Sequence, residues 1–103
     1  MDIGSMRQAA ALAGTLLRAL GNEDRLLLLC QLSQGEMSVG ELALALDIRQ
    51  PTLSQQLGVL RQEGLVSTRR EGKQIYYVVS DEKALAVIHT LYQLYCPQPG
   101  ESR

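Results

Sequence analysis

Two thiols are the most reactive side chains in this sequence. Cys30 lies within a run of leucines, and Cys96 lies beside Pro97 near the end of the chain. A free cysteine among apolar residues behaves as a small hydrophobic side chain, whereas two thiols that a fold brings together can be oxidised to a bridge. The single histidine, His89, has no obvious partner, and we expect it to serve packing or the surface. The cysteines therefore have two open roles, a structural one and a redox switch.

A different chemistry is predicted for residues 42–65, where two short helices meet at a tight turn. Leu53, Leu57 and Leu60 recur at the spacing of one helix face. The opposite face carries short, uncharged donors and acceptors in place of the lysines and glutamates of a solvated helix, and such groups suit base edges in a major groove. This pattern predicts a helix-turn-helix. Its expected base-reading residues are Gln50, Thr52, Ser54 and Gln55.

A basic β-hairpin is predicted directly after the second of these helices. Gly64 ends the helix, residues 65–68 begin an extended run, residues 69–73 form a charged turn, and residues 74–79 return as a strand. A helix-turn-helix followed by a basic hairpin is a winged helix. Its cations suit phosphate contacts, although one wing arginine could enter a minor groove. The expected phosphate-binding residues are Arg49, Arg69, Arg70 and Lys73. The competing interpretation is that the hairpin charges are only solvated and block edge pairing.

The composition fits one domain, residues 1–103, that acts inside the cell. Its residues are 46% hydrophobic and 20% charged, which is enough apolar material for one core. The formal net charge is -1, so the positive charge that binds phosphates must be local, and DNA binding should weaken with salt. No apolar run approaches the roughly 20 residues that span a bilayer, and no secretory signal is recognisable. We therefore expect a cytoplasmic protein without a membrane partner.

The remaining helices should hold this unit in place. We expect helices over about residues 7–20, 23–32 and 82–95, with Asn22 capping the second and Ser80 or Asp81 capping the last. Ser38 and Glu41 have the spacing of a capping box at the start of the helix-turn-helix. The expected fold is mainly α with a two-stranded β-hairpin wing, in the order α-α-α-α-β-β-α. Residues 1–6 and 97–103 are expected to be flexible ends.

The first and last helices carry wider apolar faces than a small domain needs. Pairing them across a two-fold axis would hide these faces and present two recognition helices to successive major grooves, about 34–36 Å apart. We therefore predict a homodimer on a pseudo-palindromic double-stranded operator. The expected interface residues are Leu12, Leu16, Ile88, Leu91, Tyr92 and Tyr95.

With these elements in view, the sequence resembles the ArsR (ArsR/SmtB) family of bacterial winged-helix repressors. The resemblance lies in LGNEDRLLLLCQL, in GEMSVGELALALDIRQPTLSQQLGVLRQEGLV and in TRREGKQIYYVV. It implies a dimer and an inducer that releases the repressor from DNA. Many members sense metals through a cysteine pair, whose places are Ser38 and Gly40 here, and others use a zinc set of which only Asp81 and His89 remain. We therefore expect no metal and no cofactor.

The positions of Cys30 and Cys96 resemble those in the sulfide- and persulfide-responsive branch of the family, often called BigR-type. The resemblance implies a repressor that binds its operator when reduced and is released when reactive sulfur species join the two cysteines by a disulfide or polysulfide. The alternative is a family repressor that responds to a metal, haem or another ligand and has structural cysteines. A winged helix used only for protein contacts is a further rival. An enzyme is not expected, because no CxxC, glycine-rich phosphate loop or activating base accompanies the thiols.

Overall fold

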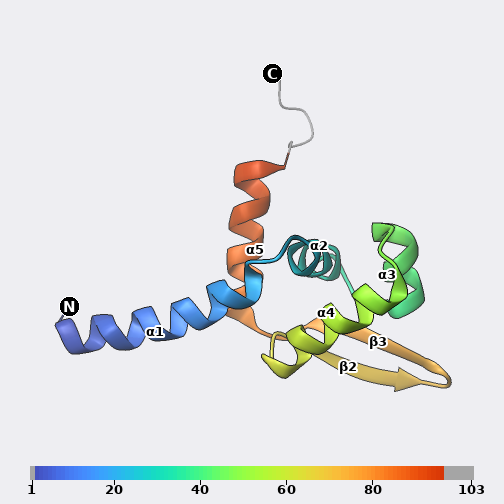
Figure 1. The fold of residues 1–103 in the computed structure, drawn as a ribbon, viewed down its shortest axis with the longest axis horizontal. Coiled ribbons are helices and arrows are strands. Elements are labelled where there is room, and N and C mark those ends of the chain that lie inside the picture. The colour runs from blue at the N-terminus through green and yellow to red at the C-terminus, as the bar shows by residue number, and fades with distance from the viewer. Residues whose placement is uncertain (1, 97–103) are drawn as a thin grey trace.

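The computed structural model describes residues 2–96, and within them the chain forms five helices and a three-stranded antiparallel sheet (Figure 1). The elements in order are α1 (Ile3–Leu20), α2 (Glu23–Leu32), β1 (Met37–Ser38), α3 (Val39–Leu46), α4 (Gln50–Gln62), β2 (Val66–Glu71), β3 (Gln74–Val79) and α5 (Glu82–Tyr95). The predicted winged helix-turn-helix is confirmed, with a third strand added.

The centre of the domain is α2, as its apolar sequence predicts. Leu28, Leu29 and Leu32 are buried to 0%, 0% and 1% exposure, and the helix contacts α1, α3, α4 and α5. Asn22 begins the helix by accepting the backbone N–H of Arg25 at 3.0 Å, as expected of a capping residue. Every other helix is therefore positioned against α2.

The helix-turn-helix is α3 and α4. The predicted capping box is present, because Ser38 Oγ accepts the N–H of Glu41 and the Glu41 carboxylate accepts the N–H of Ser38. Between the helices Asp47 adopts the left-handed conformation (φ 53°), which aspartate tolerates better than most residues. Pro51 is the second residue of α4, where its missing N–H is harmless because the first N–H groups of a helix have no partner within it.

The sheet differs from the predicted two-stranded hairpin. The two-residue strand β1 pairs with β3, and the strand order is β1-β3-β2. The hairpin turn is also tighter than predicted, since β2 runs to Glu71 and only Gly72 and Lys73 connect the strands. Gly72 has φ 63°, a conformation that glycine adopts without strain. Arg69 and Arg70 therefore lie in a strand and not in a turn, and their side chains take fixed directions from it.

Two expectations about the outer helices need correction. The helix expected from about residue 7 already begins at Ile3, so the expectation of a flexible stretch over residues 1–6 is wrong for Ile3–Met6, and the tail over residues 97–103 lies outside the described residues. Ile88 was expected at the dimer interface, but it is 1% exposed and belongs to the protomer's own core.

Helix α1 leaves the body of the domain (Figure 1). Of its residues only Ala19 and Leu20 are buried, and Leu12 and Leu17 are 74% and 59% exposed. An apolar helix face of this size needs a covering partner. No helix within residues 2–96 is both long and apolar enough to cross a membrane.

Candidate nucleic-acid interface and thiol pair

The outward face of α4 carries the residues predicted to read bases. Leu53, Leu57 and Leu60 anchor the helix in the core at 0%, 1% and 0% exposure, and this fixes which side faces outward. On that outward side Gln50, Ser54 and Gln55 are exposed, and Thr52 is half-buried. Four uncharged polar groups thus gather along about one and a half turns of helix, since a turn takes about 3.6 residues. The helix can present hydrogen-bond donors and acceptors to a groove.

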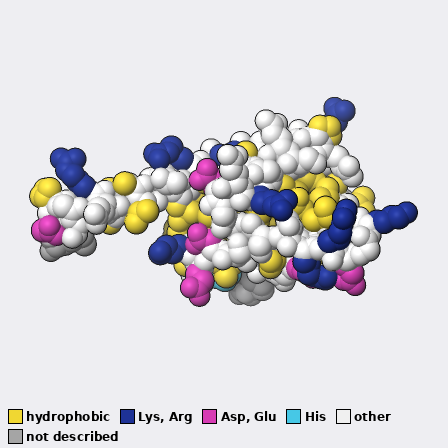
Figure 2. All heavy atoms as spheres, turned by 90° about the horizontal axis from the view of Figure 1, so that it is seen from below, with side chains coloured by type: hydrophobic (Ala, Val, Ile, Leu, Met, Phe, Trp, Pro, Cys, Tyr) yellow, Lys and Arg dark blue, Asp and Glu magenta, His cyan; other side chains and the backbone are white. Residues whose placement is uncertain are grey.

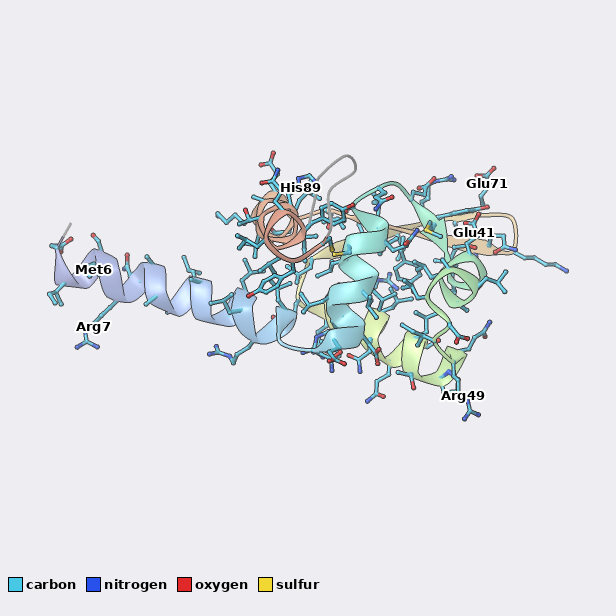
Figure 3. The ribbon with its side chains drawn as sticks, turned by 90° about the horizontal axis from the view of Figure 1, so that it is seen from above. Met6, Arg7, Glu41, Arg49, Glu71 and His89 are labelled. Atoms are coloured by element: carbon cyan, nitrogen blue, oxygen red, sulfur yellow. The ribbon has the colours of Figure 1, made fainter. Side chains whose placement is uncertain are left out.

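Arg49 stands at the start of α4. It is the N-cap residue, its side chain makes no capping hydrogen bond, and it projects from the helix into open space (Figure 3). A helix N-terminus favours anions because its first N–H groups are unpaired and its dipole is positive there. Arg49 and the N-terminus of α4 together are suited to one phosphate.

The three cations of the hairpin have different surroundings. Arg69 Nε and Nη2 donate to the two carboxylate oxygens of Glu36 at 2.8 and 2.6 Å, and Nη1 donates to Glu71 at 2.7 Å. The guanidinium also lies over the ring of Tyr76, 4.7 Å from its centroid. Arg70 and Lys73 are exposed. Arg69 therefore faces two carboxylates, whereas Arg70 and Lys73 extend into solvent.

The register of the sheet explains the position of Arg69. Arg69 is opposite Tyr76, and Tyr76 is opposite Ser38 on the other side, so a side chain from β2 crosses β3 to reach Glu36 just before β1. The hydrogen bonds from Arg69 lower the pKa of Glu36, and those to Glu36 and then Glu71 raise the pKa of Arg69. This contact ties the wing to the loop that follows α2. Sequence reasoning missed Glu36, because its partner is 33 residues away.

Figure 2 looks at the side of the molecule on which α4 and the hairpin lie. Lys and Arg side chains gather toward the end of this face where the hairpin tip and the start of α4 are found, and hydrophobic side chains and uncharged atoms lie between them. A chain with net charge -1 thus concentrates positive charge beside its recognition helix.

Gln56, next to the base-reading residues, faces inward. It is half-buried, and its Oε1 accepts a hydrogen bond from Nη1 of Arg25 at 2.9 Å. Neither residue was predicted to have a site role. The sequence offered no signal for the pair, because the two residues lie 31 apart and on different helices.

The two predicted redox residues lie on neighbouring elements. Cys30 is near the end of α2, Cys96 ends α5, and α2 contacts α5. Both thiols are half-buried. Burial raises the pKa of the Cys30 thiol, and negative charge on Cys96 raises it further. This electrostatic effect and the contact between α2 and α5 place the two cysteines in the same region of the fold.

The residues at the family's metal positions have other roles. Ser38 caps α3, and the Asp81 carboxylate accepts the N–H groups of Lys83 and Ala84 at 2.8 and 3.2 Å to cap α5. His89 is exposed on the outer side of α5 (Figure 3). Across residues 2–96, no group of three or more His, Cys, Asp or Glu side chains could hold a metal ion.

Comparison with known proteins gives one consistent result. The family model described as "Bacterial regulatory protein, arsR family" matches residues 22–68. The chain is 52% identical over 101 residues to the biofilm growth-associated repressor of Agrobacterium fabrum, covering 93% of this chain and 86% of the relative. It is 44% identical to the transcriptional activator HlyU of Vibrio cholerae, covering 93% and 89%.

Two solved structures have the same fold over nearly the whole chain. The transcriptional repressor BigR from Xylella fastidiosa superposes with a TM-score of 0.87 at 47% identity, covering 95% of this chain and 100% of that one. Reduced HlyU from Vibrio cholerae superposes with a TM-score of 0.88 at 43% identity, covering 92% and 100%.

Proposed function

Because this chain belongs to the arsR family of bacterial regulatory proteins, and is a DNA-binding transcriptional regulator and not an enzyme, we propose that it is a thiol-switched repressor. The reduced protein binds its operator. A disulfide or polysulfide bridge between Cys30 and Cys96, formed by a reactive sulfur species, releases it. Such a switch suits the cytoplasm, where thiols are kept reduced until a stress arrives.

The observation that carries this proposal is that one thiol lies near the end of α2 and the other at the C-cap of α5, two helices that are in contact. A cytosolic protein has little use for a structural disulfide. Neither is wholly buried, so a small reagent has access. A relative with the same fold is described by its reduced state, which supports redox sensitivity in this group of proteins.

The chemistry balances without a further oxidant. One cysteine thiolate attacks an inner sulfur of an organic polysulfide, forms a new S–S bond and expels a thiolate. The second cysteine loses its proton and attacks the inner sulfur now bound to the first cysteine, which expels the remaining organic group as a second thiolate and leaves a polysulfide bridge. Attack on the sulfur of the first cysteine instead expels an organic persulfide and leaves a disulfide. The donor is reduced as the cysteines are oxidised. Since burial raises the pKa of Cys30, we assign the first attack to Cys96 and the second to Cys30.

We propose that the operator is bound by a homodimer formed through α1 and α5. Their exposed apolar residues include Leu12, Tyr92 and Tyr95, at 74%, 37% and 81% exposure, while Leu16 and Leu91 are half-buried beside them. A monomeric mass in light scattering at micromolar concentration would contradict this dimer.

On this operator, Gln50, Thr52, Ser54 and Gln55 read base edges, and Arg49, Arg70 and Lys73 bind phosphates. Arg69, also predicted to bind phosphate, is engaged by Glu36 and Glu71, and we propose that it mainly holds the wing in position. Repression is the proposed direction of control because the 52% identical relative is a repressor, although another relative is an activator.

Intact-protein mass spectrometry paired with operator binding tests the switch. The protein is treated with sodium tetrasulfide, diamide or hydrogen peroxide, and each sample is analysed for added sulfur, for cross-linked cysteines and for DNA affinity. Cys30→Ser and Cys96→Ser should each bind DNA as the wild type does and stay bound after tetrasulfide. Met37→Leu is the matched control, since it removes a sulfur that accepts a hydrogen bond from Gln31 beside α2 but is no thiol. Normal release of either serine variant from DNA would refute the two-cysteine switch.

A further inference from the structure

Arg25 makes the most connected polar contact in the described part of the helical body. Its Nε donates to the carbonyl oxygen of Ala19 at 2.5 Å and its Nη2 to that of Arg18 at 3.2 Å. Its Nη1 donates to Oε1 of Gln56 at 2.9 Å. One side chain on α2 thus touches the end of α1 and the middle of α4.

The contact with α1 satisfies groups that the helix leaves open. The last four carbonyls of a helix have no partner within it, and the dipole makes that end negative. Of the α1 carbonyls, Arg18 O also accepts the N–H of Gly21 and Leu20 O accepts that of Asn22, so the guanidinium completes a cap in which Ala19 O would otherwise need another donor. A planar guanidinium can serve two carbonyls and an amide together, and a lysine ammonium cannot reproduce this fork.

Two neighbouring glutamines of α4 have different surroundings. Gln55 is exposed and predicted to read bases, whereas Gln56 turns inward to Arg25. Three buried leucines hold α4 against the core, but apolar contacts are not directional and leave small rotations and tilts open. A charge-assisted hydrogen bond is short and directional, and it sets the helix more narrowly.

We propose that Arg25 is a positioning residue that fixes the recognition helix relative to the dimerisation helix and so sets the half-site spacing that the protein accepts. This inference rests on the proposed dimer through α1 and α5. In such a dimer the separation of the two α4 helices is determined along the path from α1 through α2 to α4, and Arg25 bridges both junctions of that path. Both recognition helices can bind an operator together only when their separation matches that of successive major grooves.

The test uses the reduced full-length protein, so it does not depend on the sulfur switch. An operator is selected by the wild type from a pool of random duplexes, and further duplexes have one or two base pairs inserted or removed at its centre. Arg25→Met removes all three hydrogen bonds, and Gln56→Leu removes only the bond to α4. Arg18→Met is the control: it loses the same charge next to the site, but its side chain donates only to Thr15, and its carbonyl still accepts from Arg25.

Both variants should bind the selected operator about tenfold more weakly, a common size of coupling between sites. On operators with altered spacing the two variants should lose much less affinity than this, so that the affinity difference between the selected spacing and the others becomes smaller. The double variant should be no worse than Arg25→Met, and Arg18→Met should keep the wild-type preference. Gln56→Leu keeps the α1 cap, and it serves as the decisive variant if Arg25→Met fails to fold by circular dichroism.

Two results would overturn the proposal in distinguishable ways. A loss of affinity that is equal at every spacing would show that Arg25 and Gln56 only stabilise the fold or touch DNA directly, and the dimer would stand. A wild-type protein that is indifferent to spacing and monomeric in light scattering would refute the dimer, and the inference with it.

Discussion

The three cations of the β2–β3 hairpin should contribute unequally to DNA binding, and Arg69 should contribute least to its salt dependence. Arg70 and Lys73 are exposed, whereas Arg69 donates three hydrogen bonds to the carboxylates of Glu36 and Glu71. A cation that already faces two carboxylates has little positive potential left for a phosphate. The three residues therefore offer a comparison in which the same charge is removed from different surroundings.

The size of the effect follows from counterion release. Each phosphate neutralised by a protein adds about 0.9 to the slope of the logarithm of the binding constant against the logarithm of salt concentration. A substitution in the proposed dimer removes one cation from each of two wings, so Arg70→Gln or Lys73→Gln should reduce the slope by about 1.8. Arg69→Gln should leave the slope nearly unchanged, although affinity should fall at all salt concentrations because the wing loses its tie to Glu36.

The assay is fluorescence anisotropy on the selected operator at five salt concentrations, with reduced protein throughout. Arg7→Gln is the control, because Arg7 is an exposed cation near the start of α1, far along the chain from the hairpin (Figure 3). Glu36→Gln should make the slope steeper, since it frees the Arg69 guanidinium from its bidentate partner. If Arg69→Gln lowered the slope as much as Arg70→Gln does, the argument that the carboxylates occupy Arg69 would be wrong.

Four further outcomes test the thiol and the fold. In Cys96→Ser, alkylation of Cys30 followed by mass spectrometry should still accelerate above pH 9.0, because burial, the larger cause of its raised pKa, remains; a plateau below that pH would contradict this. The same burial favours the neutral thiol, so its contribution to stability should be present below pH 9.0 and be lost as the pH rises through the raised pKa. Ser38→Ala should lower the free energy of unfolding in urea by about 1 kcal/mol, since one half of the capping box is lost. Leu57→Ala, at a site 1% exposed, should lower it by about 2–5 kcal/mol, and a smaller loss would mean that the core closes over the cavity.

Local signals predicted much of the fold, because helix ends and turns depend on residues close in sequence. Asn22, Asp81 and the capping box of Ser38 mark helix starts where the structure has them, and the last helix and last strand have the predicted bounds. The exception is α1, because no side-chain capping hydrogen bond marks its start at Ile3.

Contacts between distant residues could not be predicted in the same way. Strand β1 is two residues long and exists because Met37 and Ser38 pair with Tyr77 and Tyr76 of β3, and no periodicity is visible over two residues. Ile88 shares a helical stripe with the aromatic residues of α5, so the sequence placed it with them at the dimer surface, although the stripe is wide enough to face both the core and the outside. The contacts of Arg25 and Arg69 span 31 and 33 residues and depend on the completed tertiary structure.

These distant contacts give α2 a second task besides filling the core. Arg25 near its start reaches the end of α1 and the middle of α4, and Cys30 near its end lies on the side of the fold where α2 contacts α5, whose C-cap is Cys96. The two positions are roughly 7.5 Å apart along a rigid helix, given a rise of about 1.5 Å per residue. A bridge that draws α5 toward the end of α2 would therefore also shift the start of α2. The hydrogen bonds from Arg25 to α1 and α4 tolerate changes in donor–acceptor distance of only a few tenths of an ångström. In the proposed dimer, a small rotation of α2 would be enough to move each recognition helix away from its groove, and no unfolding would be needed.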